Sequence, residues 1–124
     1  MKKILIVDDD RVVLASCKRI LESESYSVNL TSSVKEALQM LEEKNFDLLL
    51  VDVIMPEYDG TYLIGNVREN LPHLPILVMS GYPTPETIST GMRMGATHFI
   101  AKPFTPDELI TAVRKAIVEG KEEI

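Results

Sequence analysis

Short apolar runs alternate along the chain with segments of helical periodicity. Each run is too short for a helix and is rich in Val, Ile or Leu. The runs are Ile4–Val7, Val28–Leu30, Leu48–Val51, Ile76–Met79 and Phe99–Ala101. Three of them are continuously apolar, which is typical of parallel strands covered on both faces. The pattern therefore predicts five parallel strands.

Between the runs, apolar residues recur at the spacing of an amphipathic helix. Ser33 and Glu36 have capping-box spacing, Thr84 and Thr105 each precede a proline, and Gly95 follows the fourth periodic segment. The predicted helices cover about 11–23, 33 to at least 41, 61–70, 84–95 and 105–120.

This alternation predicts one α/β domain, doubly wound as (βα)5, with a parallel five-stranded sheet and helices on both faces. We expect the domain to span residues 1–124, with its core at about 3–119 and a short polar tail from Gly120 to Ile124. The second strand is followed only by Thr31 and Ser32, which suits a position at the edge of the sheet.

Composition excludes several classes of protein. Apolar residues make up 45% of the chain, enough for a core, and the net charge of −6 without a basic patch argues against direct nucleic-acid binding. No segment approaches the roughly 18 apolar residues of a membrane span. The lone cysteine, Cys17, is predicted to be a core residue in a cytoplasmic protein.

Polar residues follow four of the predicted strands at their carboxyl ends, where ligands bind in open α/β sheets. These residues are Asp8, Asp9, Asp52, Ser80 and Lys102. Taken singly, each fits a cap, a turn or a solvated surface position, and Asp10 fits best as an N-cap or first-turn acid of the first helix. Together they predict a site at one end of the sheet.

The charges of this group predict a cation site. Two carboxylates about 4 Å apart repel by roughly 4 kcal/mol at an effective dielectric constant near 20. Oxygen ligands in a small, partly open site favour Mg²⁺, which also accepts phosphate oxygens. Asp52, the lone acid on the third strand, is then the best nucleophile for a phosphoryl group whose charge Lys102 and Ser80 help to neutralise.

The ordered motifs resemble the response-regulator receiver family of two-component phosphorelay systems, over roughly Lys3 to Glu119. They are Ile4–Asp9, Val51–Pro56, Asp59-Gly60, Met79–Gly81, Gly95-Ala96 and Ala101–Phe104. The resemblance implies a flavodoxin-like sheet in the strand order 2-1-3-4-5. It also implies that a histidine kinase or phosphotransfer protein donates a phosphoryl group to Asp52 in a Mg²⁺-dependent reaction.

The same resemblance implies the metal ligands. Asp9 and Asp52 would bind Mg²⁺ directly, Asp8 would act mainly through metal-bound water, and the backbone carbonyl of Ile54 would supply a further ligand. Ile54 and Tyr82 lie two positions beyond Asp52 and Ser80, and neither can orient an attacking water. We therefore expect a long-lived acyl phosphate.

The resemblance further implies a switch. Ser80 and Lys102 would bond phosphoryl oxygens, Phe99 would swing inward as Ser80 moves, and the Lys102-Pro103 peptide bond would be cis. The readout face would consist of the fourth helix, fifth strand and fifth helix, and would bind a downstream effector or a second copy of the chain. Such a domain catalyses only its own phosphorylation and dephosphorylation.

Three alternatives stay open. An Asp-nucleophile phosphohydrolase would need a second acid two residues after Asp52, where Ile54 stands. A flavodoxin-like FMN protein would need a loop rich in Ser, Thr and Gly where three aspartates follow the first strand. A degenerate receiver that binds partners without phosphorylation is disfavoured because the acids, the hydroxyl and the lysine are all present.

Overall fold

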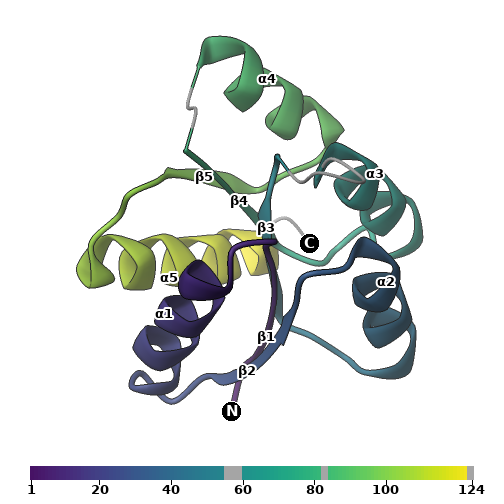
Figure 1. Cartoon of the computed structure of the whole chain (residues 1–124). Helices are drawn as coiled ribbons and strands as arrows, with labels where there is room; N and C mark the ends of the chain where they lie inside the picture. The colour runs from purple at the N-terminus through teal and green to yellow at the C-terminus, as the bar shows by residue number, and fades with distance from the viewer. Residues whose placement is uncertain (55–59, 82–83, 123–124) are drawn as a thin grey trace.

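A computed structural model describes residues 1–54, 60–81 and 84–122, with side chains at 1–54, 62–81 and 84–118. Strands and helices alternate throughout these residues (Figure 1). The elements are β1 (Lys3–Val7), α1 (Arg11–Glu22), β2 (Ser27–Thr31), α2 (Val34–Glu43), β3 (Leu48–Asp52), α3 (Gly60–Asn70), β4 (Ile76–Ser80), α4 (Pro85–Met94), β5 (His98–Ala101) and α5 (Pro106–Glu122).

The strands form one parallel sheet in the order β2-β1-β3-β4-β5. This confirms the predicted α/β architecture and places β2 at an edge. The order reverses between β1 and β3, so the chain leaves these neighbouring strands toward opposite faces of the sheet. Such a switch point opens a crevice at the carboxyl ends of the two strands.

Two apolar layers hold the helices on the sheet. Residues that alternate along the strands, such as Leu5 and Leu49, pack with α2 and α3, whereas Ile4 and Leu50 pack with α1 and α5. Figure 1 shows α1 and α5 on one side of the sheet and α2 and α3 on the other. Every residue of β3 and β4 is buried, which explains the continuous apolar runs. Cys17 is fully buried in the layer with α1, as predicted.

Helix ends follow the predicted capping chemistry. Glu108 N donates to Thr105 Oγ1 at 3.1 Å, and Thr105 N donates to Glu108 Oε1 at 2.9 Å, which completes a capping box. At α2, Glu36 N donates to Ser33 Oγ at 3.2 Å, but Ser33 N donates to Thr31 Oγ1. The N-cap by Ser33 is therefore present. The Ser33 amide, however, binds Thr31 of the preceding strand and not Glu36.

The C-terminal helix is longer than predicted. α5 continues through Gly120 to Glu122, so the polar tail predicted from Gly120 onward begins later. A glycine inside a helix costs only about 1 kcal/mol relative to alanine, and the next two residues, Lys121 and Glu122, favour helix. With no proline behind it, Gly120 does not end the helix.

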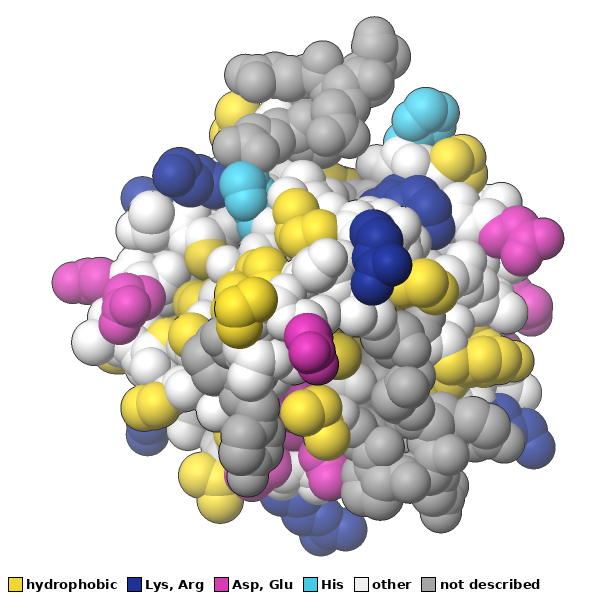
Figure 2. All heavy atoms as spheres, turned by 90° about the horizontal axis from the view of Figure 1, so that it is seen from above, with side chains coloured by type: hydrophobic (Ala, Val, Ile, Leu, Met, Phe, Trp, Pro, Cys, Tyr) yellow, Lys and Arg dark blue, Asp and Glu magenta, His cyan; other side chains and the backbone are white. Residues whose placement is uncertain are grey.

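The face of the molecule that carries α4 is mixed in character. Figure 2 shows the face that carries α4, where Lys and Arg side chains are spread among acidic and hydrophobic ones rather than gathered in one patch. Within the described residues, no helix combines the length and the apolar character needed to cross a bilayer.

Candidate functional site

The pairing of β1 with β3 brings two buried carboxylates together. Val7 is in register with Val51, so Asp8 and Asp52 follow side by side at the carboxyl edge of the sheet. Asp8 is fully buried and Asp52 is 6% exposed, whereas Asp9 is exposed. One carboxylate oxygen from each of the three acids lies within 4.8 Å of the others. The predicted acidic cluster is therefore present.

Backbone amides hold the two buried carboxylates in the same way. Asp10 N donates to Asp8 Oδ1 at 2.9 Å, and Ile54 N donates to Asp52 Oδ1 at 2.8 Å. In each case the amide lies two residues after the acid, where a short Asp side chain can reach it. One oxygen of each carboxylate is thus fixed, and the other is left for a cation.

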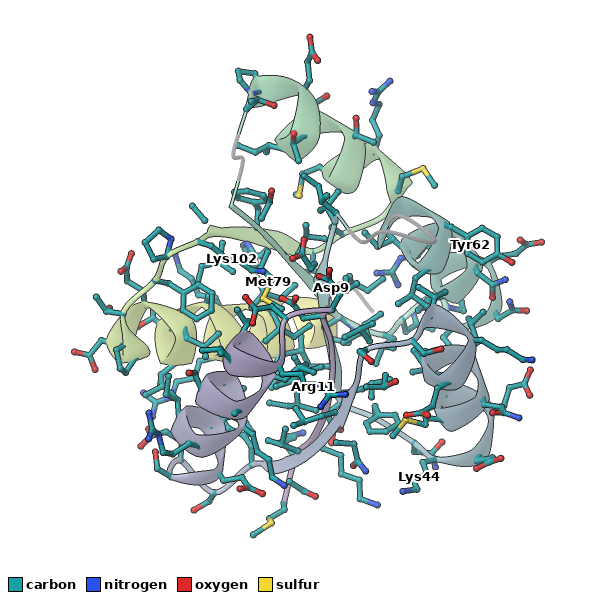
Figure 3. All side chains as sticks on the ribbon, in the orientation of Figure 1. Asp9, Arg11, Lys44, Tyr62, Met79 and Lys102 are labelled. Carbon is teal, nitrogen blue, oxygen red and sulfur yellow. The ribbon has the colours of Figure 1, made fainter. Side chains whose placement is uncertain are left out.

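Lys102 supplies that cation. Its ammonium donates to Asp8 Oδ2 at 2.7 Å and to Asp52 Oδ2 at 2.6 Å. The lysine follows β5, and its backbone amide donates to the Ser80 carbonyl at 2.8 Å. Figure 3 shows Lys102 and Asp9 at the same end of the sheet, with Lys44 and Tyr62 lying away from them. The Lys102-Pro103 bond is cis, as the resemblance implied.

The charges of the site keep Lys102 protonated. Burial alone would lower the pKa of its ammonium, but hydrogen bonds to Asp52 and Asp8, together with their negative charges, outweigh burial and raise it. Beneath the site, burial and the charge of Asp8 raise the pKa of Cys17 to about 11. That cysteine is therefore a neutral thiol and no nucleophile at physiological pH.

The other predicted residues are placed less directly. Ser80 is fully buried at the end of β4, one residue beyond Met79, which is in register with Asp52. Ile54 is 49% exposed beside the acids, and the metal-binding role of its carbonyl stays a prediction. Phe99 is partly buried and packs against the layer formed with α2 and α3. Tyr82 lies outside the described residues.

The donor set fits a small hard cation. All three side chains offer carboxylate oxygens, and the exposed Asp9 faces the solvent from which an ion would arrive. Mg²⁺ takes such ligands and keeps several waters, and it suits sites with only a few carboxylates. Asp10 is not part of this set, since its carboxylate caps α1 by accepting from Val12 N at 2.9 Å.

Comparisons with known proteins agree with this geometry. The family model described as "Response regulator receiver domain" matches residues 4–114. The chain belongs to the response-regulator receiver family. It is 36% identical over 121 residues to the response regulator MprA of Mycobacterium avium, which covers 98% of this chain and 53% of MprA. MprA of Mycobacterium tuberculosis matches equally well, so this chain spans about half the length of the curated relatives it matches.

Solved receiver domains have the same fold. A CheY-like receiver domain protein from Methanospirillum hungatei is 33% identical, with a TM-score of 0.93 over 100% of this chain and 99% of that one. The beryllofluoride-activated NtrC4 receiver domain dimer is 31% identical, with a TM-score of 0.91 over 97% of this chain and 99% of that one. The fold and family expected from the motifs are thereby confirmed.

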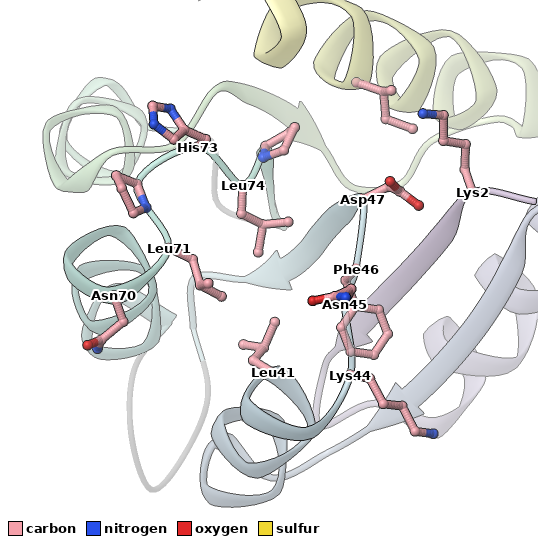
Figure 4. A pocket seen from close by; sticks show the side chains of 13 residues that line it. Lys2, Leu41, Lys44, Asn45, Phe46, Asp47, Asn70, Leu71, His73 and Leu74 are labelled. Atoms are coloured by element: carbon pink, nitrogen blue, oxygen red, sulfur yellow. The ribbon is translucent and has the colours of Figure 1, made fainter. Parts of the chain in front are cut away.

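A separate cavity of about 390 Å³ lies at the opposite, amino-terminal edge of the sheet (Figure 4). Its walls include Leu41, Phe46 and Leu74, with Lys2 and Asp47 nearby. None of the predicted site residues that the structure describes lines it. The cavity and the acidic cluster therefore lie at opposite edges of the sheet.

The hydrogen bonds from the amides of Asp10 and Ile54 to the two buried acids were not predicted from the sequence. A usable signal existed, because an Asp at the end of a strand often accepts a hydrogen bond from the amide two residues on. The bond from Lys102 to a phosphoryl oxygen stays a prediction for the phosphorylated protein; in the unmodified protein the ammonium contacts Asp8 and Asp52.

Replacing Lys102 with Met should destabilise the protein, because two buried carboxylates would lose their shared cation. We expect the free energy of unfolding at pH 7, measured with urea, to fall by about 3 kcal/mol. Since the pKa of Lys102 is raised by folding, its contribution is complete below about pH 10.4 and is lost only as pH rises further.

The matched control is Lys44→Met, which removes an exposed ammonium and should change stability by less than about 0.5 kcal/mol. The difference between wild type and Lys102→Met should not shrink between pH 7 and 10. Equal stability of the two proteins at pH 7 would show that the ammonium does not hold the acids.

Proposed function

We propose that Asp52 accepts a phosphoryl group from the phosphohistidine of a histidine kinase or phosphotransfer protein, in a Mg²⁺-dependent reaction. One observation carries this proposal: the nearly buried Asp52 carboxylate lies 2.6 Å from the Lys102 ammonium within a group of three acids. This carboxylate lies at the switch point of the sheet, beside other ligands for a hard cation and beside a positive charge. It is therefore suited to attack phosphorus and to form an aspartyl phosphate.

The transfer step follows from the placement of these groups. An Asp52 carboxylate oxygen attacks phosphorus, the P–N bond of the donor breaks, and the electron pair leaves with the histidine nitrogen. Asp9, Asp52 and the Ile54 carbonyl would hold Mg²⁺ directly and Asp8 mainly through metal-bound water, and the ion would supply positive charge to the transferred oxygens. Lys102 shifts from the carboxylate to one of these oxygens, and Ser80 hydrogen-bonds another.

We infer that the domain catalyses only its own phosphorylation and dephosphorylation. A phosphohydrolase acting on small molecules would need a second acid to protonate its leaving group, and Ile54 occupies that position. A degenerate receiver would be expected to lack part of the charge set, yet Asp8, Asp52 and Lys102 are joined by short hydrogen bonds. A phosphotransfer receiver explains both observations.

Phosphorylation would be read at the face formed by α4, β5 and α5. Ser80 ends β4 directly before the segment that leads into α4, and Phe99 lies on the neighbouring β5. Movement of Ser80 toward a phosphoryl oxygen would let Phe99 turn inward and change this face. Its partner would be a downstream effector, or a second copy of the chain, in the cytoplasm. The net charge of −6 argues against nucleic acid as the direct partner.

Asp52→Asn should abolish labelling. We expect intact-mass spectrometry to show one added phosphoryl group on the wild-type protein with acetyl phosphate and Mg²⁺, and less than about a hundredth of that on the variant, since an amide is a poor nucleophile. Asp107→Asn, an exposed acid at the start of α5, is the control and should label normally. Full labelling of Asp52→Asn would refute the assignment.

The half-exposed Ile54 should lengthen the life of the acyl phosphate, because it offers no group to orient an attacking water. Ile54→Asn should raise the first-order dephosphorylation rate by about tenfold, less than the roughly 10²–10⁴-fold of a general acid or base, because an amide can orient the water but does not take its proton. Ile54→Leu is the matched apolar control and should leave the rate near that of the wild type. An unchanged rate in Ile54→Asn would count against this role.

A further inference from the structure

The carboxyl end of α4 is tied to α3 by one side chain. Arg68, in the last turn of α3, donates from Nε and Nη2 to the Gly95 carbonyl at 3.1 and 2.7 Å. Gly95 is the C-cap of α4 and is left-handed, with φ 118°. A positively charged guanidinium at this end of a helix also interacts favourably with the negative end of the helix dipole.

The same guanidinium also binds backbone carbonyls just beyond the carboxyl end of α3. Nη1 of Arg68 donates to the Pro72 carbonyl at 2.7 Å and to the Leu71 carbonyl at 3.3 Å, both just beyond the last residue of α3. One planar donor group thus joins the carboxyl ends of two helices. Lysine could not do this, because its single ammonium lacks the fixed fork of donors.

Close approach of the two helices accompanies these bonds. A Cβ built on Gly95 would lie 2.8 Å from Cγ and Nε of Arg68, and one built on Gly65 would lie 2.9 Å from Cε of Met94. Glycine at both positions lets the last turn of α4 lie directly on α3. The carboxyl end of α4 is therefore fixed by both hydrogen bonds and van der Waals contact.

The amino end of α4 is held differently. Thr84 Oγ1 accepts from Thr87 N at 3.1 Å, and the two hydroxyl oxygens lie 2.8 Å apart, so these bonds stay within the first turn. Thr84, Pro85 and Glu86 are exposed. Figure 1 shows α4 standing off from the sheet, and its amino end is the one that follows Ser80 along the chain.

We propose that Arg68 is a positioning residue that fixes the carboxyl end of α4, so that uptake of a phosphoryl group moves the helix at its amino end. This inference rests on the proposed function, because Ser80 is the group that pulls. A helix held at one end and pulled at the other pivots, which concentrates the change around Thr84 to Ile88. Without the clamp, the same pull would shift the whole helix.

Amide hydrogen exchange tests both halves of this proposal. In unmodified Arg68→Met, amides of residues 91–96 should exchange roughly tenfold faster than in the wild type, equivalent to about 1.4 kcal/mol of local stability. In the wild type, beryllofluoride with Mg²⁺, an analogue of the aspartyl phosphate, should change exchange over residues 84–90 and leave 91–96 within about twofold. In Arg68→Met, the change should extend over the whole helix.

Two further variants keep the test decisive. Arg93→Met removes an exposed arginine from the last turn of α4 and should behave as the wild type. Arg68→Lys keeps the positive charge but lacks the planar set of guanidinium donors, and should behave as Arg68→Met. Unchanged exchange at 91–96 in both Arg68 variants would overturn the clamp. Equal beryllofluoride effects at both ends of wild-type α4 would overturn the pivot.

The proposed function can fail separately. If the wild type takes up neither a phosphoryl group nor beryllofluoride, the proposed function falls and the pivot falls with it. The comparison of unmodified proteins would still show whether Arg68 clamps α4.

Discussion

The site depends on one ammonium shared between two buried carboxylates. Asp8 and Asp52 end adjacent strands, and Lys102 lies within 2.7 Å of an oxygen of each. Without a cation between them, two carboxylates in this partly buried site would repel each other by about 4 kcal/mol at a separation of 4 Å. The two acids lie close together because the parallel strands β1 and β3 end at the same edge of the sheet. Lys102, which follows β5 at that edge, offsets the repulsion between them.

The contacts of Lys102 with the two acids also bear on the proposed phosphoryl transfer. Under the proposed function, the bonds from Lys102 to the two acids are exchanged when a metal ion or a phosphoryl group arrives. Backbone amides hold one oxygen of each acid, which would keep the carboxylates in place while their cation partner changes. Such an arrangement would suit a two-state element, in which a local change in charge biases the positions of β4 and α4.

Much of this could be predicted from the sequence, for identifiable reasons. Strands such as β3 are buried on both faces and therefore read as unbroken apolar runs. Residues that follow parallel strands must meet at one edge, so Asp8, Asp52 and Lys102 could be grouped without coordinates. The role of Arg68 could not be found in this way, because the partners described for it are backbone carbonyls, which carry no sequence signature. The end of α5 was missed because Gly120 was given more weight than its helix-forming neighbours.

The most direct test of the central claim is the stabilisation by Mg²⁺ of the wild type, Asp9→Asn and Asp10→Asn, measured as the shift in urea midpoint. Ligand binding stabilises the folded state by RT ln(1 + [L]/Kd). The acids at the carboxyl edge predict a clear shift for the wild type and for Asp10→Asn, in which asparagine still caps α1, and a much smaller shift for Asp9→Asn. Equal shifts in all three proteins would contradict a metal site built from Asp8, Asp9 and Asp52.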